Sequence, residues 1–263
     1  MIKIKFENLL VSIVVSVVVF FNTISTTMLD RTFFQVKVNF LFIVVLLLGL
    51  RFLYKMRVSY KYLILSILLL LSGGLVYFQT NRLNFLVYSM LLVLLVNVDM
   101  KVVLRNYVVV AGILVVGVFL LSLIGMIPNL QYNRAGVIRN SFGFIYPTDF
   151  ASHCFYLFLA ISYLLKDKFI WTRSLFGVLL SAFIIKYCDA RLNALSILLA
   201  TVIFIYFYYS NGKKIKIFAL LPYSAVVFAS VVTYFSYKFS WSNPFLVSIN
   251  KLITGRLALG RNA

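Results

Sequence analysis

Charged residues are scarce in this sequence. They make up 12% of the 263 residues, and aspartate and glutamate together number only six. A soluble domain is about one quarter charged and about half apolar, whereas 63% of this chain is hydrophobic. So few charges cannot cover a water-exposed surface. We therefore expect the chain to lie in a membrane.

Metal-ligating residues and cofactor motifs are equally sparse. The sequence has one histidine, His153, and two cysteines, Cys154 and Cys188, which is too few for a disulfide framework or a zinc site. It also contains no P-loop, no glycine-rich dinucleotide loop and no serine-nucleophile elbow. We therefore expect no metal, no cofactor and no nucleotide-driven transport by this chain alone.

The positive charge does not indicate nucleic-acid binding. The formal net charge is +19, but the lysines and arginines lie in short loops between apolar runs, where basic residues set the orientation of a membrane protein. The sequence offers no continuous basic face for a phosphate backbone to follow.

Long apolar runs are what the sequence does contain. Each is long enough to approach the roughly 30 Å of hydrocarbon in a bilayer, and none shows the alternation typical of a membrane β-barrel. We predict an all-α, polytopic, single membrane domain over residues 1–263, in which the continuously apolar runs are helices. Its nine expected helices cover residues 9–29, 38–54, 62–78, 83–98, 107–127, 150–165, 174–187, 192–209 and 217–237.

The loops predict an orientation. Lys3 and Lys5 precede the first run, and two short loops, 55–61 and 213–216, are rich in basic residues. Because the positive-inside bias is strongest in short loops, we expect a cytoplasmic N-terminus. Three polar segments then lie outside: the loop 128–148, the turn 186–193 and the tail 238–263.

Arginines in these outer segments stand out because the positive-inside bias selects against them. A guanidinium stays charged, and its planar fork matches phosphate oxygens. If the helices bring these arginines together, they form an anion site that suits a lipid-linked phosphate or diphosphate. The alternative is that they reach individually toward headgroups of membrane lipid. The four candidates are Arg134, Arg139, Arg191 and Arg256.

Three further residues are candidates for acid–base chemistry, and each has a structural alternative. Asp149 begins a predicted helix, so it is either a helix-capping residue or a carboxylate that accepts a proton from a hydroxyl. Asp189 has the same catalytic role or forms a local ion pair with Arg191. His153 falls one turn after Asp149 on the same helix face and is either a base or a hydrogen-bonded structural residue.

Three segments carry a resemblance to a known family. RNSFGFIYPTDFASHCF at residues 139–155 resembles the R-x-SFGF-x-HPN segment of Wzy-type polysaccharide polymerases, the repeat-unit polymerases of capsule and O-antigen assembly. YCDARLNAL at 187–195 resembles the helix start that follows it, and LITGRLALG at 252–260 resembles the later GR-L-x-LG segment. The match runs from about residue 134 to the end; the first five predicted helices match only in hydropathy.

The resemblance implies a fold, an activity and partners. The fold is a helical bundle of the O-antigen polymerase and ligase superfamily in the bacterial cytoplasmic membrane. The activity is an inverting, metal-independent glycosyl transfer between polyprenyl-diphosphate-linked oligosaccharides, with chain-length regulator and flippase proteins as pathway partners. Arg139, Arg191 and Arg256, followed by Arg134, would stabilise the leaving diphosphate.

The chain departs from the family in two places, and other functions stay open. Tyr146, Pro147 and Thr148 stand where the family has His-Pro-Asn, so a base role there passes to Asp149 or His153. Family members continue with further helices after the last matching segment, so a truncated, non-catalytic member is one alternative. An O-antigen-type ligase and a lipid-linked glycan flippase or transporter are the others. The nearly uncharged helix centres argue against transport.

Overall fold

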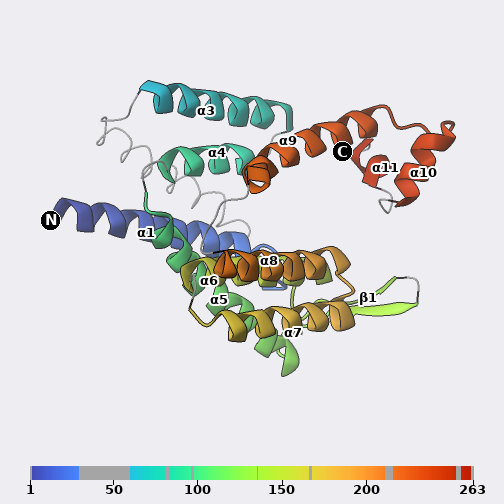
Figure 1. The fold of residues 1–263 in the computed structure, drawn as a ribbon, viewed down its shortest axis with the longest axis horizontal. Helices are drawn as coiled ribbons and strands as arrows, with labels where there is room; N and C mark the ends of the chain where they lie inside the picture. Colours follow the sequence, from blue (N-terminus) through green and yellow to red (C-terminus); the bar gives the residue numbers. More distant parts are fainter. Residues whose placement is uncertain are drawn as a thin grey trace. The chain divides into compact units, whose positions relative to one another are not determined.

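The computed structural model describes residues 2–29, 60–80, 83–95, 98–134, 136–165, 168–210, 216–252 and 256–261. The described chain is mostly helical and forms two compact units, residues 1–208 and 209–263 (Figure 1). The predicted helix at 38–54 lies outside the described residues. That the chain forms a single membrane domain stays a prediction.

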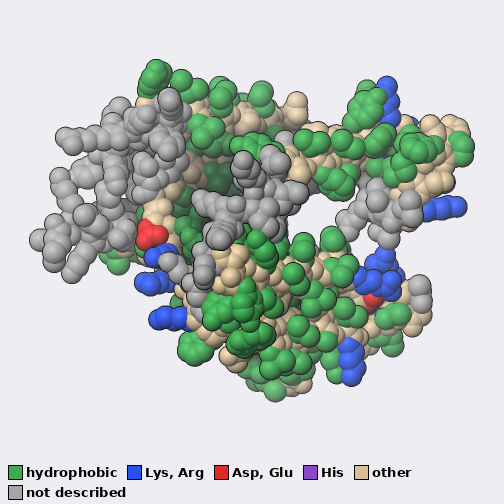
Figure 2. All heavy atoms as spheres, in the orientation of Figure 1, with side chains coloured by type: hydrophobic (Ala, Val, Ile, Leu, Met, Phe, Trp, Pro, Cys, Tyr) green, Lys and Arg blue, Asp and Glu red, His purple; other side chains and the backbone are tan. Residues whose placement is uncertain are grey.

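The first unit holds seven of the described helices: α1 (Ile2–Ile24), α3 (Tyr60–Thr80), α4 (Leu83–Leu95), α5 (Met100–Leu123), α6 (Pro147–Leu165), α7 (Ile170–Cys188) and α8 (Arg191–Tyr209). α1 packs on α5, α5 on α6, and α6 on α7, while α3 pairs with α4. Their outward surface is largely hydrophobic, and lysine and arginine side chains lie toward the helix ends (Figure 2).

The general prediction of a helical protein embedded in a membrane is confirmed. Among the described residues, five helices are long and apolar enough to cross a bilayer: 63–80 within α3, and the whole of α5, α6, α7 and α8. The number of nine spans and the cytoplasmic N-terminus stay predictions.

Helix starts were the weakest part of the sequence prediction. The helix expected from residue 107 begins at Met100, because the Asp99 side chain caps its first turn by accepting a hydrogen bond from the Lys101 N–H at 3.0 Å. That helix also ends at Leu123, before the predicted limit, and Gly125 follows with a φ of +78°. An apolar run locates the middle of a helix, whereas capping residues set its ends.

A pair of short strands lies outside the apolar runs for which the sequence predicts helices. Strands β1 (Gln131–Arg134) and β2 (Val137–Asn140) form an antiparallel hairpin within the loop 128–148. Its turn uses Gly136 at a φ of +83°, and the Gly136 N–H bonds the Asn133 side chain at 3.1 Å. The strand sequences, QYNR and VIRN, lack the strict apolar–polar alternation that indicates a strand.

Aromatic residues pack where the hairpin returns to the helices. Phe142, Phe144 and Phe150 are buried, and Phe119 of α5 stacks on Phe150 with ring centroids 5.7 Å apart. The Phe144 segment also pairs with the residues just after α1, because the Ile145 N–H donates to the Thr26 carbonyl at 2.8 Å. The SFGF sequence is therefore the buried base of the loop, and it ties together α1, α5 and α6.

The second unit consists of α9 (Lys216–Tyr237), α10 (Pro244–Leu252) and α11 (Arg256–Arg261). The residues expected to form a polar tail thus fold into two short helices around buried Phe239, Leu246 and Leu257. Buried Asn250 accepts hydrogen bonds from the N–H groups of Leu257 and Ala258, which fixes the start of α11 on α10.

Candidate functional site

Arg139 joins the hairpin to the end of α7. Its Nε donates to the carbonyl oxygen of Cys188, the last residue of α7, at 2.8 Å. Carbonyls at a helix C-terminus lack partners within the helix and carry the negative end of its dipole, so a guanidinium is favoured there. Arg139 is half-buried, and its position depends on a bond between residues 49 apart in sequence.

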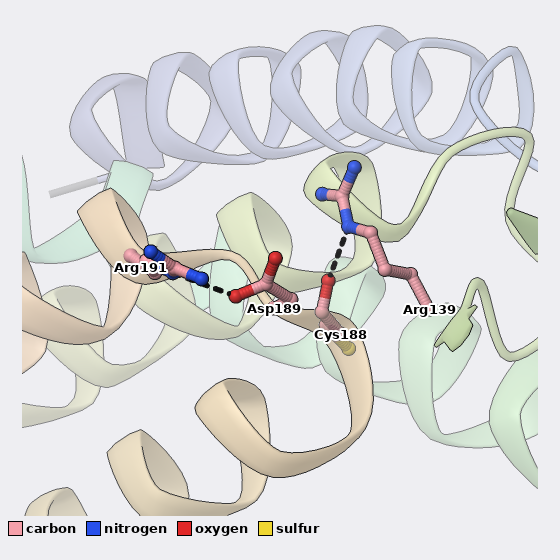
Figure 3. Close-up of polar contacts among 4 residues, drawn as sticks. All are labelled: Arg139, Cys188, Asp189 and Arg191. Carbon is pink, nitrogen blue, oxygen red and sulfur yellow. Dashed lines mark hydrogen bonds and ion pairs between the residues drawn. The ribbon is translucent and has the colours of Figure 1, made fainter. Parts of the chain in front are cut away.

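Arg191 reaches the same turn from the other side. Asp189 ends α7 with a left-handed backbone, φ 44°, and this brings its carboxylate to 2.8 Å from the Nε of Arg191. The Asp189 side chain is 10% exposed and that of Arg191 is 77% exposed. Figure 3 shows the two arginines flanking the Cys188–Asp189 turn. The structure thus places Arg139 and Arg191 together, and Asp189 forms the local ion pair that the sequence offered as one alternative.

Both arginines use Nε for these internal bonds. Within the described part of the chain, neither has a hydrogen bond from its two terminal nitrogens. Those of Arg139 point away from the Cys188 carbonyl in Figure 3. The terminal nitrogens of a guanidinium form the fork that binds phosphate or carboxylate oxygens in pairs. The turn therefore presents two such forks beside one carboxylate.

Arg134 lies on the same face of the hairpin as Arg139. Tyr132 pairs with Arg139 and Arg134 with Val137, and directly opposed residues point to one side of a hairpin. Arg134 is exposed at the tip, two pairs further along the hairpin than Arg139. It is thus an outlying cation beside the pair formed by Arg139 and Arg191.

Two asparagines that the sequence analysis did not single out hold the base of the hairpin in place. The Asn129 side-chain oxygen accepts from the N–H groups of Ser141 and Phe142, at 3.1 and 2.8 Å. The Asn129 amide donates to the Asn140 side chain at 3.2 Å. These bonds fix the base of the hairpin on which Arg139 stands. Asparagine commonly binds backbone groups in turns, but the partners here depend on the fold.

Asp149 and Asn193 lie on facing first turns of α6 and α8. Asp149 is half-buried in the first turn of α6 after Pro147, where its charge complements the helix dipole. Asn193 follows Arg191 by two residues and donates to the Thr148 carbonyl at 3.2 Å and to Ser152 Oγ at 3.1 Å. Asn193 thereby ties the start of α8, and with it Arg191, to the start of α6.

His153 has a structural contact. Its Nε2 lies 2.9 Å from Thr26 Oγ1, and its ring packs on Phe144 at 5.4 Å between centroids. This bond connects α6 to the residues that follow α1. This geometry is the hydrogen-bonded alternative that the sequence offered, and His153 also borders an open, mostly apolar hollow between α1, α4, α5 and α6.

Arg256 begins α11 in the second unit. Its side chain lies outside what the structure describes, so its place in a common arginine site stays a prediction.

The geometry suits anion binding with a carboxylate nearby. The searched, described residues contain no cluster of three His, Cys, Asp or Glu side chains able to hold a metal ion. Comparisons of the chain with protein-family models, with curated proteins and with solved structures found no match.

Proposed function

We propose that this protein polymerises polyprenyl-diphosphate-linked oligosaccharide repeat units at the outer face of a bacterial cytoplasmic membrane. In this reaction the hydroxyl of one lipid-linked unit attacks the anomeric carbon of another, and the polyprenyl diphosphate leaves. The observation that carries the proposal is the placement of Arg139 and Arg191 on either side of the Cys188–Asp189 turn at the end of α7 (Figure 3).

The two arginines match the charge that grows on the leaving group. Negative charge accumulates on the diphosphate as the glycosidic bond breaks, and prepositioned donors stabilise that charge without reorganising. The internal Nε bonds preposition both guanidinium groups, because each fixes the side chain while leaving the terminal fork for oxygens. Asp189, which binds Arg191, serves in this proposal as a positioning residue.

Asp149 is the better of the two candidates for the base. A base must reach the proton that it takes from the attacking hydroxyl. The Asp149 carboxylate has a backbone hydrogen bond with Tyr146 at the start of α6 and keeps further lone pairs that can accept a proton, whereas the Nε2 atom of His153 bonds Thr26. We therefore assign proton acceptance to Asp149.

The test is the glycan profile of a strain that lacks the gene. Loss of polymerisation leaves single repeat units at the cell surface without a ladder of longer chains. Long chains that stay on the lipid carrier would instead identify a ligase, and absence of any unit at the outer face a flippase. An unchanged ladder would refute all three activities.

Variants then test the arginine pair in the complemented strain. Removing one such donor costs roughly 100-fold or more in rate, so Arg139→Ala and Arg191→Ala should abolish chain growth. Arg105→Ala is the matched control, because Arg105 is an exposed arginine near the start of α5, at the opposite end of that helix from the site. Equal membrane levels of all three variants would exclude misfolding, and normal ladders from both site variants would refute the diphosphate role.

A further inference from the structure

Three large aromatic side chains are exposed where α9 turns into α10. Tyr237 ends α9, Trp241 lies in the turn, and Phe245 is the second residue of α10. Their exposed fractions are 79%, 71% and 64%. Tyrosine and tryptophan are enriched at the boundary between hydrocarbon and water, because an apolar ring there carries a polar group that can reach the wet side. The turn therefore has the side chains of a membrane interface.

The helix α10 has two unlike faces. Leu246 and Asn250 are buried against the rest of the second unit. On the opposite face, Phe245, Ser248 and Lys251 recur at three-residue spacing and are exposed. The nine residues of α10 extend for roughly 14 Å, about half of the hydrocarbon thickness. A helix of this length cannot cross a bilayer, but an exposed face that combines an aromatic ring with a lysine suits a helix lying along its surface.

The second unit carries charge of one sign only. No aspartate or glutamate follows Asp189 in the sequence, whereas residues 209–263 contain seven basic residues. These are Lys213, Lys214, Lys216, Lys238, Lys251, Arg256 and Arg261.

Two of these cations lie beside the exposed rings. Lys238 follows Tyr237 directly, and its Nζ lies 5.9 Å from the centroid of that ring. Lys251 shares the outward face of α10 with Phe245, and both lysines are exposed. Lysines near a bilayer surface are attracted by anionic headgroups. A second copy of this unit would instead bring like charges together, so the charge favours lipid over self-association.

We propose that α10 and the turn before it lie in the interface of a bilayer and bind anionic phospholipid headgroups. Trp241 and Phe245 insert between the lipids, and Lys238 and Lys251 contact the lipid phosphates. The segment that the sequence presents as a polar tail is then a membrane-surface element. This inference rests on the second unit alone and does not depend on the proposed function.

Fluorescence of Trp241 in the full chain, reconstituted in lipid vesicles, tests the insertion. The sequence has two tryptophans, Trp171 and Trp241, so Trp171→Phe leaves Trp241 as the sole reporter. The quenchers are phosphatidylglycerol with bromine atoms near the headgroup end of the acyl chains, the same lipid with bromine near the methyl end, and aqueous iodide. If Trp171→Phe reduces the folded yield, the difference between the wild-type and Trp241→Phe fluorescence gives the same signal.

Each outcome decides the location of Trp241. We expect stronger quenching by the shallow bromine than by the deep bromine, and weak quenching by iodide. Strong quenching by iodide alone would place Trp241 in water and overturn the proposal. Protection from every quencher would place Trp241 against protein, including a second copy of the chain, and would overturn it as well. Strongest quenching by the deep bromine would place it in the hydrocarbon core and refute a surface helix.

The headgroup preference is tested by the same reporter. We expect shallow-brominated phosphatidylglycerol to quench Trp241 more than phosphatidylcholine brominated at the same position. Each basic residue near an anionic surface contributes roughly fivefold to local attraction, so replacing both Lys238 and Lys251 by Gln should remove most of this preference. The matched control is Lys101→Gln, which removes an exposed lysine at the start of α5. Equal quenching by the two wild-type lipid mixtures, or an unchanged preference in the double variant, would overturn the anionic assignment.

Discussion

Gly143 is the residue whose substitution most directly tests how the loop base packs on the helices. Its φ is +83°, and a Cβ added there would lie 2.9 Å from Val118 Cγ1 and 3.1 Å from both Ser122 Cβ and the Val118 carbonyl oxygen. The last contact is with the backbone of α5, which cannot rotate aside. The Gly143 carbonyl also accepts the Met28 N–H at 3.0 Å, so the segment is held on its other side.

The expected cost of Gly143→Ala has two parts. A left-handed backbone costs a residue with a Cβ about 1–2 kcal/mol, and overfilling a packed site adds about 1–3 kcal/mol. The sum is about 2–5 kcal/mol in the free energy of unfolding. At about 2–4 °C per kcal/mol for a chain near this size, the Tm should fall by at least about 4 °C.

Gly136→Ala separates the two parts. Gly136 has the same φ of +83°, but a Cβ there would meet no atom within 4 Å. We therefore expect it to lose only the backbone term, about 1–2 kcal/mol. Thermal unfolding of the purified proteins in one detergent, followed by intrinsic fluorescence, gives both Tm values.

The comparison has a clear negative outcome. If Gly143→Ala lowers the Tm no more than Gly136→Ala does, the close approach of the loop base to α5 is wrong. The anchoring of the hairpin by the SFGF segment would then be wrong as well.

Three further substitutions test other contacts by the same unfolding assay. Gly177→Ala should lower the free energy of unfolding by about 1–3 kcal/mol, because its Cβ would meet the Thr201 hydroxyl at 2.5 Å. Gly117→Ala has open space for its Cβ and should instead stabilise α5 by about 0.5–1 kcal/mol. Equal changes in Tm for the two variants would contradict this packing. Asn129→Ala removes the acceptor for two backbone N–H groups and should cost about 1–3 kcal/mol, and an unchanged Tm would show that the hairpin base does not need it. Thr26→Val removes the partner of His153 and should cost about 1 kcal/mol; a stability equal to wild type would count against that bond.

Several features of the site were accessible from sequence and several were not. Arginines in outer segments are visible because composition and loop position single them out. The Asp189–Arg191 pair is local, and residues two apart across a turn can be matched from sequence alone. The bond from Arg139 to the Cys188 carbonyl, in contrast, depends on the hairpin register and on the packing of α7 against it. Neither the hairpin register nor the packing of α7 can be recognised from residues that are close in sequence.

The sequence by itself determined that this chain is helical and membrane-embedded, because burying some 20 consecutive apolar residues in lipid requires a helix whose backbone groups bond one another. That requirement depends only on local composition. Tertiary structure decided that Arg139 and Arg191 flank one turn and that His153 bonds Thr26. These outcomes follow from contacts between residues far apart in the chain, whose energies depend on how the helices pack.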